Sequence, residues 1–362
     1  MAITRIGNPA IADVRGVNFR NIIINGDMSI SQRSTSASSI TSSGYHALDR
    51  HRLAISSLGT WTISQSTDVP TGQGFGKSMK FDCTTADASP SAGDVMWVQH
   101  RIEGQNLQYL KKGTSSAEKT TLSFWVKSNK TGTYIAELED TDNSRHIAKS
   151  YTISSSDTWE KKTITFDGDT TGTLTNDNNT SLELHLYLGA GTNYTSGTLA
   201  TSWASNTDAN RAVGQVNLAD STSNEWYVTG IQLEAGSQAS DFEFLPFDVN
   251  LKRCQRYFYT TYDVGTAPGT QSNDDVPQVF APATNSYFGF IIYYSSPMRD
   301  APTIVIYNPN TGATGSGTTD GNADKSMNTF KISEKMVHVA ANNTSISSSA
   351  SIKCHITASA EL

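Results

Sequence analysis

The sequence predicts an all-β protein made of an antiparallel β-sandwich, a short helix and a second, smaller β domain. Only 36% of the 362 residues are hydrophobic and 17% are charged, and small polar residues fill the spaces between short apolar runs. Several runs alternate apolar and polar residues, which is the period of a strand with one buried face. After Pro246 the period changes to that of an amphipathic helix.

The clearest strand covers residues 181–188, where four leucines occupy alternate positions: Leu182, Leu184, Leu186 and Leu188. Residues 120–127 alternate in the same way. Further strands are expected at 61–64, 78–83, 95–102, 133–139, 147–153, 161–166 and 226–233. Because no helical period separates these segments, they indicate a two-sheet antiparallel sandwich. The connection at 189–224 is too long for a hairpin, and such loops usually have a function or an embedded element.

Four regions are expected: an N-terminal arm (1–44), the sandwich (45–246), a helical linker (247–262) and a small C-terminal β domain (263–362). The arm contains Asn25-Gly26 after three isoleucines, which predicts a hairpin because both central positions of its turn need a positive φ. We expect the arm to dock onto another protein. A disordered leader is the alternative.

The linker has apolar residues at helical spacing: Phe247, Leu251, Cys254 and Phe258. Asp248 is the expected N-cap. About three turns are too few for a helix to be stable alone, so this helix must pack on a domain or on copies of itself. Beyond it, strands are expected near 280, 287–294, 303–307, 330–332, 336–340 and 352–356, around a polar loop at 308–322.

Charge and cysteine content exclude several classes of protein. The formal net charge of −7 argues against nucleic acid as a partner, because that association depends on neutralising phosphates. The three cysteines, Cys83, Cys254 and Cys354, are widely spaced and indicate buried thiols rather than a zinc site. Residues 1–16 have no signal-peptide core and no apolar run is long enough to span a bilayer. We therefore expect synthesis in a cytoplasm and no membrane insertion.

Several blocks of residues resemble phage tail-fibre and virion-associated proteins. The closing block runs Val228-Thr-Gly-Ile-Gln-Leu-Glu-Ala-Gly236, then Phe242-Glu-Phe-Leu-Pro246, then Leu251-Lys-Arg-Cys-Gln-Arg-Tyr-Phe258. The opening block is Asn21-Ile-Ile-Ile-Asn-Gly-Asp-Met28 with Gln32-Arg33, and Leu122-Ser-Phe-Trp-Val-Lys-Ser128 resembles the central strand of such proteins. Together, and in this order, the blocks span about residues 18–260.

The resemblance implies a carbohydrate-binding-module-like jelly roll, commonly in trimeric virion fibres, and no catalytic set. We therefore expect a non-enzymatic tail-fibre or tail-tip protein, located in the virion after synthesis in the host cytoplasm. Its expected partners are two further copies in a homotrimer, other virion tail proteins, and polysaccharide or lipopolysaccharide of the host surface. The alternative is a structural virion subunit without a host ligand, such as a fibre base, a tail junction or a capsid decoration.

Sugar recognition needs flat aromatic faces together with polar side chains that bind hydroxyl groups. Outward-facing candidates are Trp125, Glu137, Glu183, His185 and Tyr187, which would form one groove if their strands share a sheet. The alternative is that this face is solvated or covered by the 189–224 loop.

A second candidate pair lies within that loop. Tyr194 and Trp203 are aromatic residues in a long polar connection. They are candidates for glycan contact, or they pin the loop to the sheet.

Metal and enzyme signatures are weak. Asp167-Gly-Asp169-Thr-Thr171-Gly172 resembles the start of an EF-hand loop, but the twelfth position is Asn178 where a bidentate glutamate is needed. The stretch therefore predicts a turn, and we expect neither a metal nor a cofactor. A structural calcium ion, which jelly rolls of this broad type can hold, is the alternative. Glu137 and Glu139 share a strand face, which is more typical of two solvated acids than of a glycosidase pair.

Overall fold

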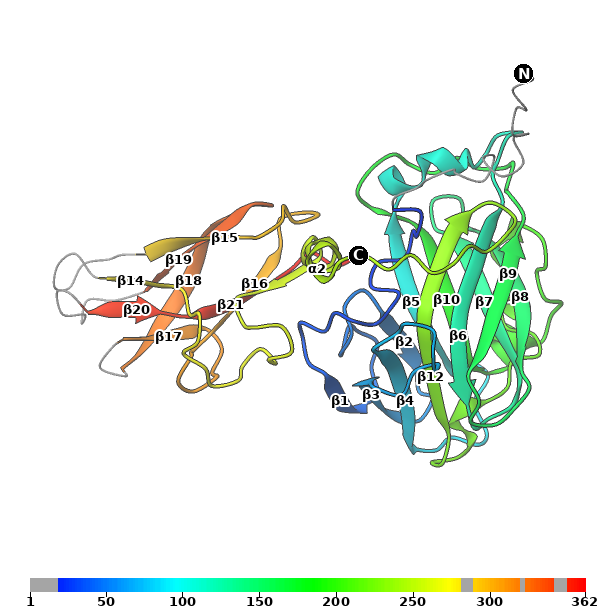
Figure 1. Cartoon of the computed structure of the whole chain (residues 1–362), viewed down its shortest axis with the longest axis horizontal. Helices are drawn as coiled ribbons and strands as arrows, with labels where there is room; N and C mark the ends of the chain where they lie inside the picture. Colours follow the sequence, from blue (N-terminus) through cyan, green and yellow to red (C-terminus); the bar gives the residue numbers. More distant parts are fainter. Residues whose placement is uncertain (1–18, 281–288, 320–322, 342–349) are drawn as a thin grey trace, which may run out of the picture.

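The computed structural model describes residues 19–280, 289–319, 323–341 and 350–362. It is nearly all-β, with 42% of the described residues in strands and 8% in helices. Figure 1 shows two β-rich bodies lying side by side, with helix α2 (Phe247–Gln255) between them. The larger body is the predicted sandwich and the smaller one is the C-terminal β domain.

Sheet A of the sandwich has six antiparallel strands. In spatial order they are β1 (Ser36–Ile40), β3 (Thr60–Ser66), β4 (Ser78–Thr85), β12 (Glu225–Ala235), β6 (Thr120–Ser128) and β9 (Glu160–Phe166).

Sheet B also has six antiparallel strands. In spatial order they are β11 (Ala204–Ser205), β8 (Arg145–Ile153), β7 (Gly132–Asp140), β10 (Thr180–Ala190), β5 (Val95–Glu103) and β2 (Arg52–Ser56). Because the chain crosses repeatedly from one sheet to the other, the two sheets form a jelly-roll-like sandwich, as predicted.

The core lies between the two sheets and follows the alternation in the sequence. The four leucines of β10 are all buried, and they face buried aromatic side chains of sheet A that include Trp61, Phe81, Phe124 and Trp226. Each fully buried side chain of this kind stabilises the fold by roughly 1.5–3 kcal/mol. All nine strands predicted between residues 61 and 233 are present, each within two residues at either end.

Short helices occupy the connections of the sandwich. They are η1 (Gly104–Asn106), η2 (Gln108–Leu110), α1 (Thr192–Thr195), η3 (Asp208–Asn210) and η4 (Leu218–Asp220). Three of the five, together with β11, lie in the long connection between β10 and β12. The embedded elements expected for that loop are therefore present.

Residues 19–44 are part of the sandwich and not a separate arm. The Ser/Thr-rich run forms β1, which pairs with β3, and the Ile22 N–H donates to the carbonyl of Leu233. The expected hairpin at Asn25-Gly26 is absent. Asn25 has a φ of 61°, but its side chain bonds the backbone of Ile30 and Asp49 and closes a turn without flanking strands. Residues 1–18 of the predicted arm lie outside the described residues.

The predicted helix is present as α2 but ends earlier, and Asp248 is not its cap. The capping position is Pro246. Asp248 lies in the first turn, where the charge of its carboxylate interacts favourably with the helix dipole. Cys254 is buried against Ile24 and Ile30, so the helix packs on its own chain. Cys83 and Cys354 are likewise free and buried, which confirms the prediction for all three cysteines.

The C-terminal domain begins at Phe258, earlier than predicted. Its three-stranded sheet has β13 (Phe258–Thr260), β21 (His355–Ser359) and β16 (Thr303–Tyr307). Its six-stranded sheet has β14 (Gln278–Phe280), β20 (Ser351–Lys353), β17 (Ser316–Thr319), β18 (Asp324–Ile332), β19 (Met336–Ala341) and β15 (Gly289–Tyr293). The expected loop at 308–322 contains β17, which sequence alternation did not indicate.

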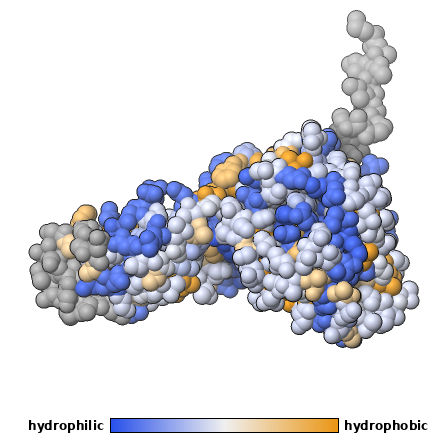
Figure 2. All heavy atoms as spheres, turned by 90° about the horizontal axis from the view of Figure 1, so that it is seen from below, coloured by the Kyte–Doolittle hydropathy of each residue, from blue (hydrophilic) through white to orange (hydrophobic). Residues whose placement is uncertain are grey.

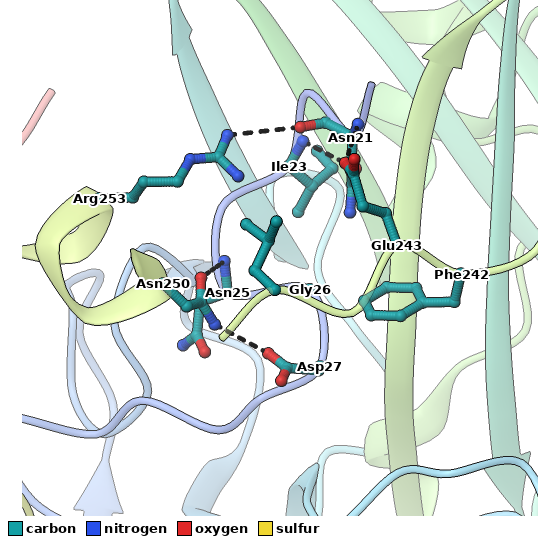
Figure 3. A pocket seen from close by; sticks show the side chains of 10 residues that line it. Asn21, Ile23, Asn25, Gly26, Asp27, Phe242, Glu243, Asn250 and Arg253 are labelled. Carbon is teal, nitrogen blue, oxygen red and sulfur yellow. Dashed lines mark hydrogen bonds between the residues drawn. The ribbon is translucent and has the colours of Figure 1, made fainter. Parts of the chain in front are cut away.

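The two bodies are joined by polar contacts around α2. Asn250 accepts a hydrogen bond from the Asn25 N–H and donates to Asp27, and Arg253 donates to the carbonyl of Asn21 (Figure 3). Figure 2 shows that apolar side chains also gather at this neck. The resemblance blocks at 21–33 and 228–258 therefore meet at one junction.

Candidate glycan-binding surface

Trp125 lies on the outward face of sheet A. Its neighbours Phe124 and Val126 are buried in the core, so the half-buried ring of Trp125 faces away from it. In the sheet Trp125 is opposite Thr229 of β12 and Lys161 of β9. This position is open to a ligand from the solvent side.

Two more aromatic rings lie on the same face, around Lys127, two residues along β6 from Trp125. The Lys127 Nζ is 4.4 Å from the ring centroid of Tyr227 and 5.8 Å from that of Trp159. The centroids of Trp159 and Tyr227 are 6.2 Å apart, with the ring planes at 67°. Trp125, Lys127, Trp159 and Tyr227 are called the aromatic face below.

Ionised side chains surround the aromatic face. Asp68, in the loop between β3 and β4, pairs with Lys127 and accepts a hydrogen bond of 2.9 Å from the Trp159 indole. Glu225 accepts bonds of 2.6 Å from Lys80 and from the Tyr227 hydroxyl.

Both carboxyl groups are held in the charged form. Burial works against their ionisation, but hydrogen bonds from Lys127 and Trp159 lower the pKa of Asp68. Bonds from Lys80 and Tyr227 likewise lower the pKa of Glu225 against the effect of burial. The surface thus combines aromatic rings with fixed donors and acceptors, which is the chemistry that binds and orients a sugar.

The other strand candidates do not share a groove with Trp125. Glu137, Glu183, His185 and Tyr187 lie on β7 and β10 of sheet B, whereas Trp125 lies on sheet A. The side chains of Glu137, His185 and Tyr187 are fully buried, and Glu183 is nearly so. The expected common groove is therefore absent, because the connection after β10 folds over this face of sheet B.

The two loop candidates fix that connection to the sandwich. The Tyr194 ring lies 6.4 Å from the ring of Trp97 on β5, beside a small apolar cluster. The indole of Trp203 donates a 2.7 Å hydrogen bond to the Asp167 carbonyl and packs against the main core. Both rings are half-buried, and their contacts agree with the pinning role considered for them.

Beneath the loop lies a buried ionic network. His185 contacts Glu137 through Nδ1 at 2.9 Å and Glu183 through Nε2 at 2.8 Å. Arg211 of the loop lies 2.9 Å from Glu137 and 2.6 Å from Glu139. Glu137 and Glu139 are therefore not two solvated acids, since an arginine bridges them and Glu137 is fully buried.

These contacts determine the protonation of the network. Burial opposes the charge of His185, but hydrogen bonds to Glu137 and Glu183 raise its pKa to about 9. Burial also opposes the charge of Glu137, but hydrogen bonds from His146 and His185 and the charge of Arg211 lower its pKa well below the usual range. The buried charges are thus paired with one another, as a low-dielectric site requires.

The same network contains residue types that can bind a metal ion. One donor atom from each of Glu137, Glu139 and His185 lies within 4.8 Å of the others. Arg211 already bridges the two carboxylates, and protonated His185 has no free lone pair for a cation. A metal ion would have to displace the arginine and deprotonate the histidine, so the residues do not fit one as they stand.

The EF-hand-like stretch forms ion pairs with a lysine and an arginine of the protein. The Asp169 carboxylate is 2.7 Å from Arg145 and 3.0 Å from Lys112, and it accepts a hydrogen bond from the Thr171 N–H. The chain bends at 171–172. This is the expected turn, and its principal carboxylate already has two partners.

Sequence reasoning missed most of the aromatic face. Tyr227 was within a predicted strand, and its alternation with the buried Trp226 and Val228 could have placed it outward. Trp159 precedes its strand and Asp68 lies in a loop, so neither has a periodic signal. Only the pairing of β6 with β9 and β12 brings these residues to Trp125.

Comparison with known proteins gives matches among solved structures only. No protein-family model and no curated protein sequence matches the chain. One similar structure is the enzymatically active domain of tailspike protein 4 of bacteriophage CBA120, at 12% identity and a TM-score of 0.31. The match covers 60% of this chain and 21% of the tailspike chain.

Two other similar structures are sugar-binding proteins by their descriptions. A putative sugar-binding protein from Bacteroides thetaiotaomicron has 12% identity and a TM-score of 0.34, over 59% of this chain and 99% of its own. A family 11 carbohydrate-binding module from Clostridium thermocellum, in complex with a mixed-linked tetrasaccharide, has 14% identity and a TM-score of 0.25 over 57% and 91%. At such scores the function must be inferred from the residues of this chain.

Within the described residues, no helix is both long enough and apolar enough to cross a membrane.

Proposed function

We propose that this chain is a glycan-binding attachment protein of a bacterial virus, a tail-fibre or tail-tip component that binds host polysaccharide or lipopolysaccharide through the aromatic face of sheet A. The observation that carries the proposal is the set of Trp125, Trp159 and Tyr227 on one outward sheet face, beside lysine and carboxylate groups of fixed charge. The virion assignment rests on the resemblance of the blocks at 21–33, 122–128 and 228–258.

The aromatic face has the composition that a polysaccharide needs. A sugar ring has apolar C–H faces that pack on an aromatic ring and hydroxyl groups that need donors and acceptors. Lys80 and Lys127 supply donors, whereas Asp68 and Glu225 supply acceptors, all anchored by one another. The rigid sheet beneath them keeps these groups in place without a ligand.

Affinity electrophoresis in gels containing candidate host polysaccharides tests the proposal. Trp125→Ala and Trp159→Ala should each weaken binding about tenfold or more, because each removes a stacking ring, while the unfolding temperature stays close to that of the parent protein. Phe280→Ala is the matched control, since this ring is 62% exposed on the C-terminal domain. Unchanged retardation of both tryptophan variants would remove the aromatic face from consideration.

A structural virion subunit is the second candidate function. This function is favoured because the residues that carry the resemblance make structural contacts at the junction. Gln232 and Glu234 form hydrogen bonds with residues 240–243, and the Asn21 side chain forms hydrogen bonds with the backbone of β12. These blocks thus hold the two bodies together without any ligand. A folded protein that binds no polysaccharide, glycolipid or host cell would favour this function.

We also propose a homotrimer, following the same resemblance. The C-terminal domain exposes apolar side chains suited to contact with another copy, among them Ile291, Tyr293, Phe330 and Ile332. Multi-angle light scattering should give about three times the 39.1 kDa chain mass. A single species at the monomer mass would contradict the trimer.

A further inference from the structure

A cleft of about 660 Å³ lies at the junction of the two bodies, on the side where α2 meets the η1 and η2 turns. Its walls come from residues 19–24, the end of β5, the two turns and the C-terminal half of α2. Its volume is in the range of small-molecule sites. It lies apart from the aromatic face, with which it shares no lining residue.

Three arginines line the cleft, and two of them already have carboxylate partners. Arg256 makes a two-pronged contact with Glu103, with both nitrogen–oxygen distances 2.7 Å. Arg101 lies 3.0 Å from Glu183 and donates to the Leu362 carbonyl. Each of these two guanidinium groups therefore has a carboxylate partner within the protein.

Arg253 differs from the other two. In the part of the chain that the structure describes, its guanidinium makes one long hydrogen bond, 3.4 Å to the carbonyl of Asn21, and no ion pair (Figure 3). Its other contact is with the ring of Phe19, whose centroid is 5.8 Å away. Burial lowers the pKa of Arg253, and the charge of Glu243 offsets this effect only in part. Among the described residues, Arg253 is thus the one arginine of the cleft without an ion pair.

The mouth of the cleft presents rings and amides. Tyr109 is 49% exposed, and it lines the same cleft as Arg253. The neighbouring Asn106 is exposed and has no side-chain hydrogen bond to any described residue. One concave site therefore gathers a flat ring, an amide without a hydrogen bond and a guanidinium without an ion pair, counting partners among the described residues.

We propose that this cleft binds an acidic sugar residue, with the carboxylate on Arg253, the ring against Tyr109 and a hydroxyl group on Asn106. A planar guanidinium matches a carboxylate with two parallel hydrogen bonds, which a neutral sugar cannot accept, and phosphate is the probe that separates a carboxylate from other oxyanions. The C–H face of the sugar ring accounts for an exposed tyrosine beside the charge. The site is a second one, independent of whether the aromatic face binds glycan.

Isothermal titration calorimetry on the full chain tests the assignment. The probes are a hexuronic acid disaccharide, the same disaccharide with its carboxyl groups reduced to alcohols, and inorganic phosphate. The variants are Arg253→Gln and Tyr109→Ala. Lys252→Gln is the matched control, because it removes the same charge from the exposed neighbouring position of α2.

We expect the uronic acid to bind, and its affinity to fall at least about tenfold in Arg253→Gln and several-fold in Tyr109→Ala. Lys252→Gln and Trp125→Ala should bind as the parent protein does, and the reduced disaccharide should bind at least about tenfold more weakly. If Arg253→Gln unfolds because its bond to Asn21 is lost, Tyr109→Ala decides the test, since its ring is largely on the surface.

Several results would overturn the assignment. These are equal binding of the acidic and reduced disaccharides, unchanged affinity in a folded Arg253→Gln or in Tyr109→Ala, and phosphate binding as tight as that of the uronic acid. Loss of uronic acid binding in Trp125→Ala would place the sugar on the aromatic face, so the two proposals fail separately.

Discussion

His185 is a charged side chain that is buried in the sandwich and stabilised by charged partners. It has no solvent exposure, yet it lies between the carboxylates of Glu137 and Glu183 and carries a proton at neutral pH. A lone buried imidazolium would be unstable, and a lone buried carboxylate equally so. Because Arg211 comes from the 191–224 loop, the pairing also attaches that loop to sheet B.

The raised pKa of His185 predicts a pH dependence of stability. His185 has a pKa of about 9 in the folded protein and of about 6.5 in the unfolded chain. Its protonation therefore stabilises the fold fully below the unfolded pKa, and this contribution is lost as the pH rises through the folded pKa. The loss should be on the order of 3 kcal/mol. Urea unfolding at pH 6 and pH 10 should show it in the parent protein. In His185→Gln the decrease should be much smaller, and an equal decrease would contradict this account.

Removing Arg211 should release the loop. Arg211→Ala leaves the buried Glu137 without its guanidinium partner, which typically costs about 3–5 kcal/mol. Guanidinium unfolding should measure that loss, and limited proteolysis should cut within 191–224. Lys161→Ala removes an exposed cation from sheet A and serves as control. Parent-like stability of Arg211→Ala would mean that the network does not hold the loop.

Among the elements, β12 contains a β-bulge that positions the chain leading to α2. Its pairing with β6 shifts register between Thr229 and Gln232, and Gly230 within this bulge has a φ of +63°. Beyond the bulge, Gln232 and Glu234 bind the chain that leads to α2. The bulge therefore connects the sandwich to the junction.

Gly230→Ala should disturb this connection. An added Cβ would lie 2.5 Å from the ring of Phe75, which packs against Phe242 and Phe244, and alanine would also be strained at a positive φ. We expect a loss of roughly 2–3 kcal/mol in the free energy of unfolding. Gly72→Ala is the control, since it has a similar φ of +76° but open space around it. Equal losses in the two variants would assign the effect to strain alone.

The strands of the sandwich could be predicted because their pattern is local. Alternation fixes which side of β6, β10 or β12 faces the core between the sheets, whichever strand lies next to it. The strands β1, β2 and β11 were missed because they are short, and β1 is rich in serine rather than apolar residues. Asn25-Gly26 predicted a hairpin, but distant partners such as Asp49 formed a different turn.

The candidate site was less predictable because it depends on non-local contacts. Alternation correctly turned Trp125 and His185 away from the core, but it could not show that they lie on different sheets. Alternation also could not show that Arg211, 26 residues after His185, folds back over the outer face of sheet B, while the outer face of sheet A stays uncovered by this loop. The aromatic face required the strand order, which the sequence pattern does not specify.

At the scale of the whole molecule, the C-terminal end of the chain helps to hold the two bodies together. Glu361 pairs with Arg33 and with the fully buried Arg50, both in the sandwich. The Arg50 guanidinium also lies over the Tyr257 ring, 3.5 Å from its centroid. Ion pairs and a cation–π contact therefore link the C-terminal end of the chain to the sandwich.

Glu361→Gln should loosen this junction. The change leaves the buried Arg50 without a carboxylate, so we expect a cost of about 3 kcal/mol or more. Calorimetry should then resolve two unfolding transitions, and small-angle scattering should show a wider spread of overall dimensions. Glu334→Gln, an exposed acid of the C-terminal domain, should change neither. A single unshifted transition in Glu361→Gln would contradict the role of this pair.

The measurement that tests the central claim most directly is adsorption of the labelled full chain to candidate host cells with and without their surface polysaccharide. The account predicts saturable adsorption that needs the polysaccharide and that falls at least about tenfold when Trp125 and Trp159 are both changed to alanine. Adsorption that ignores the polysaccharide, or that the folded double variant retains in full, would contradict glycan attachment through sheet A.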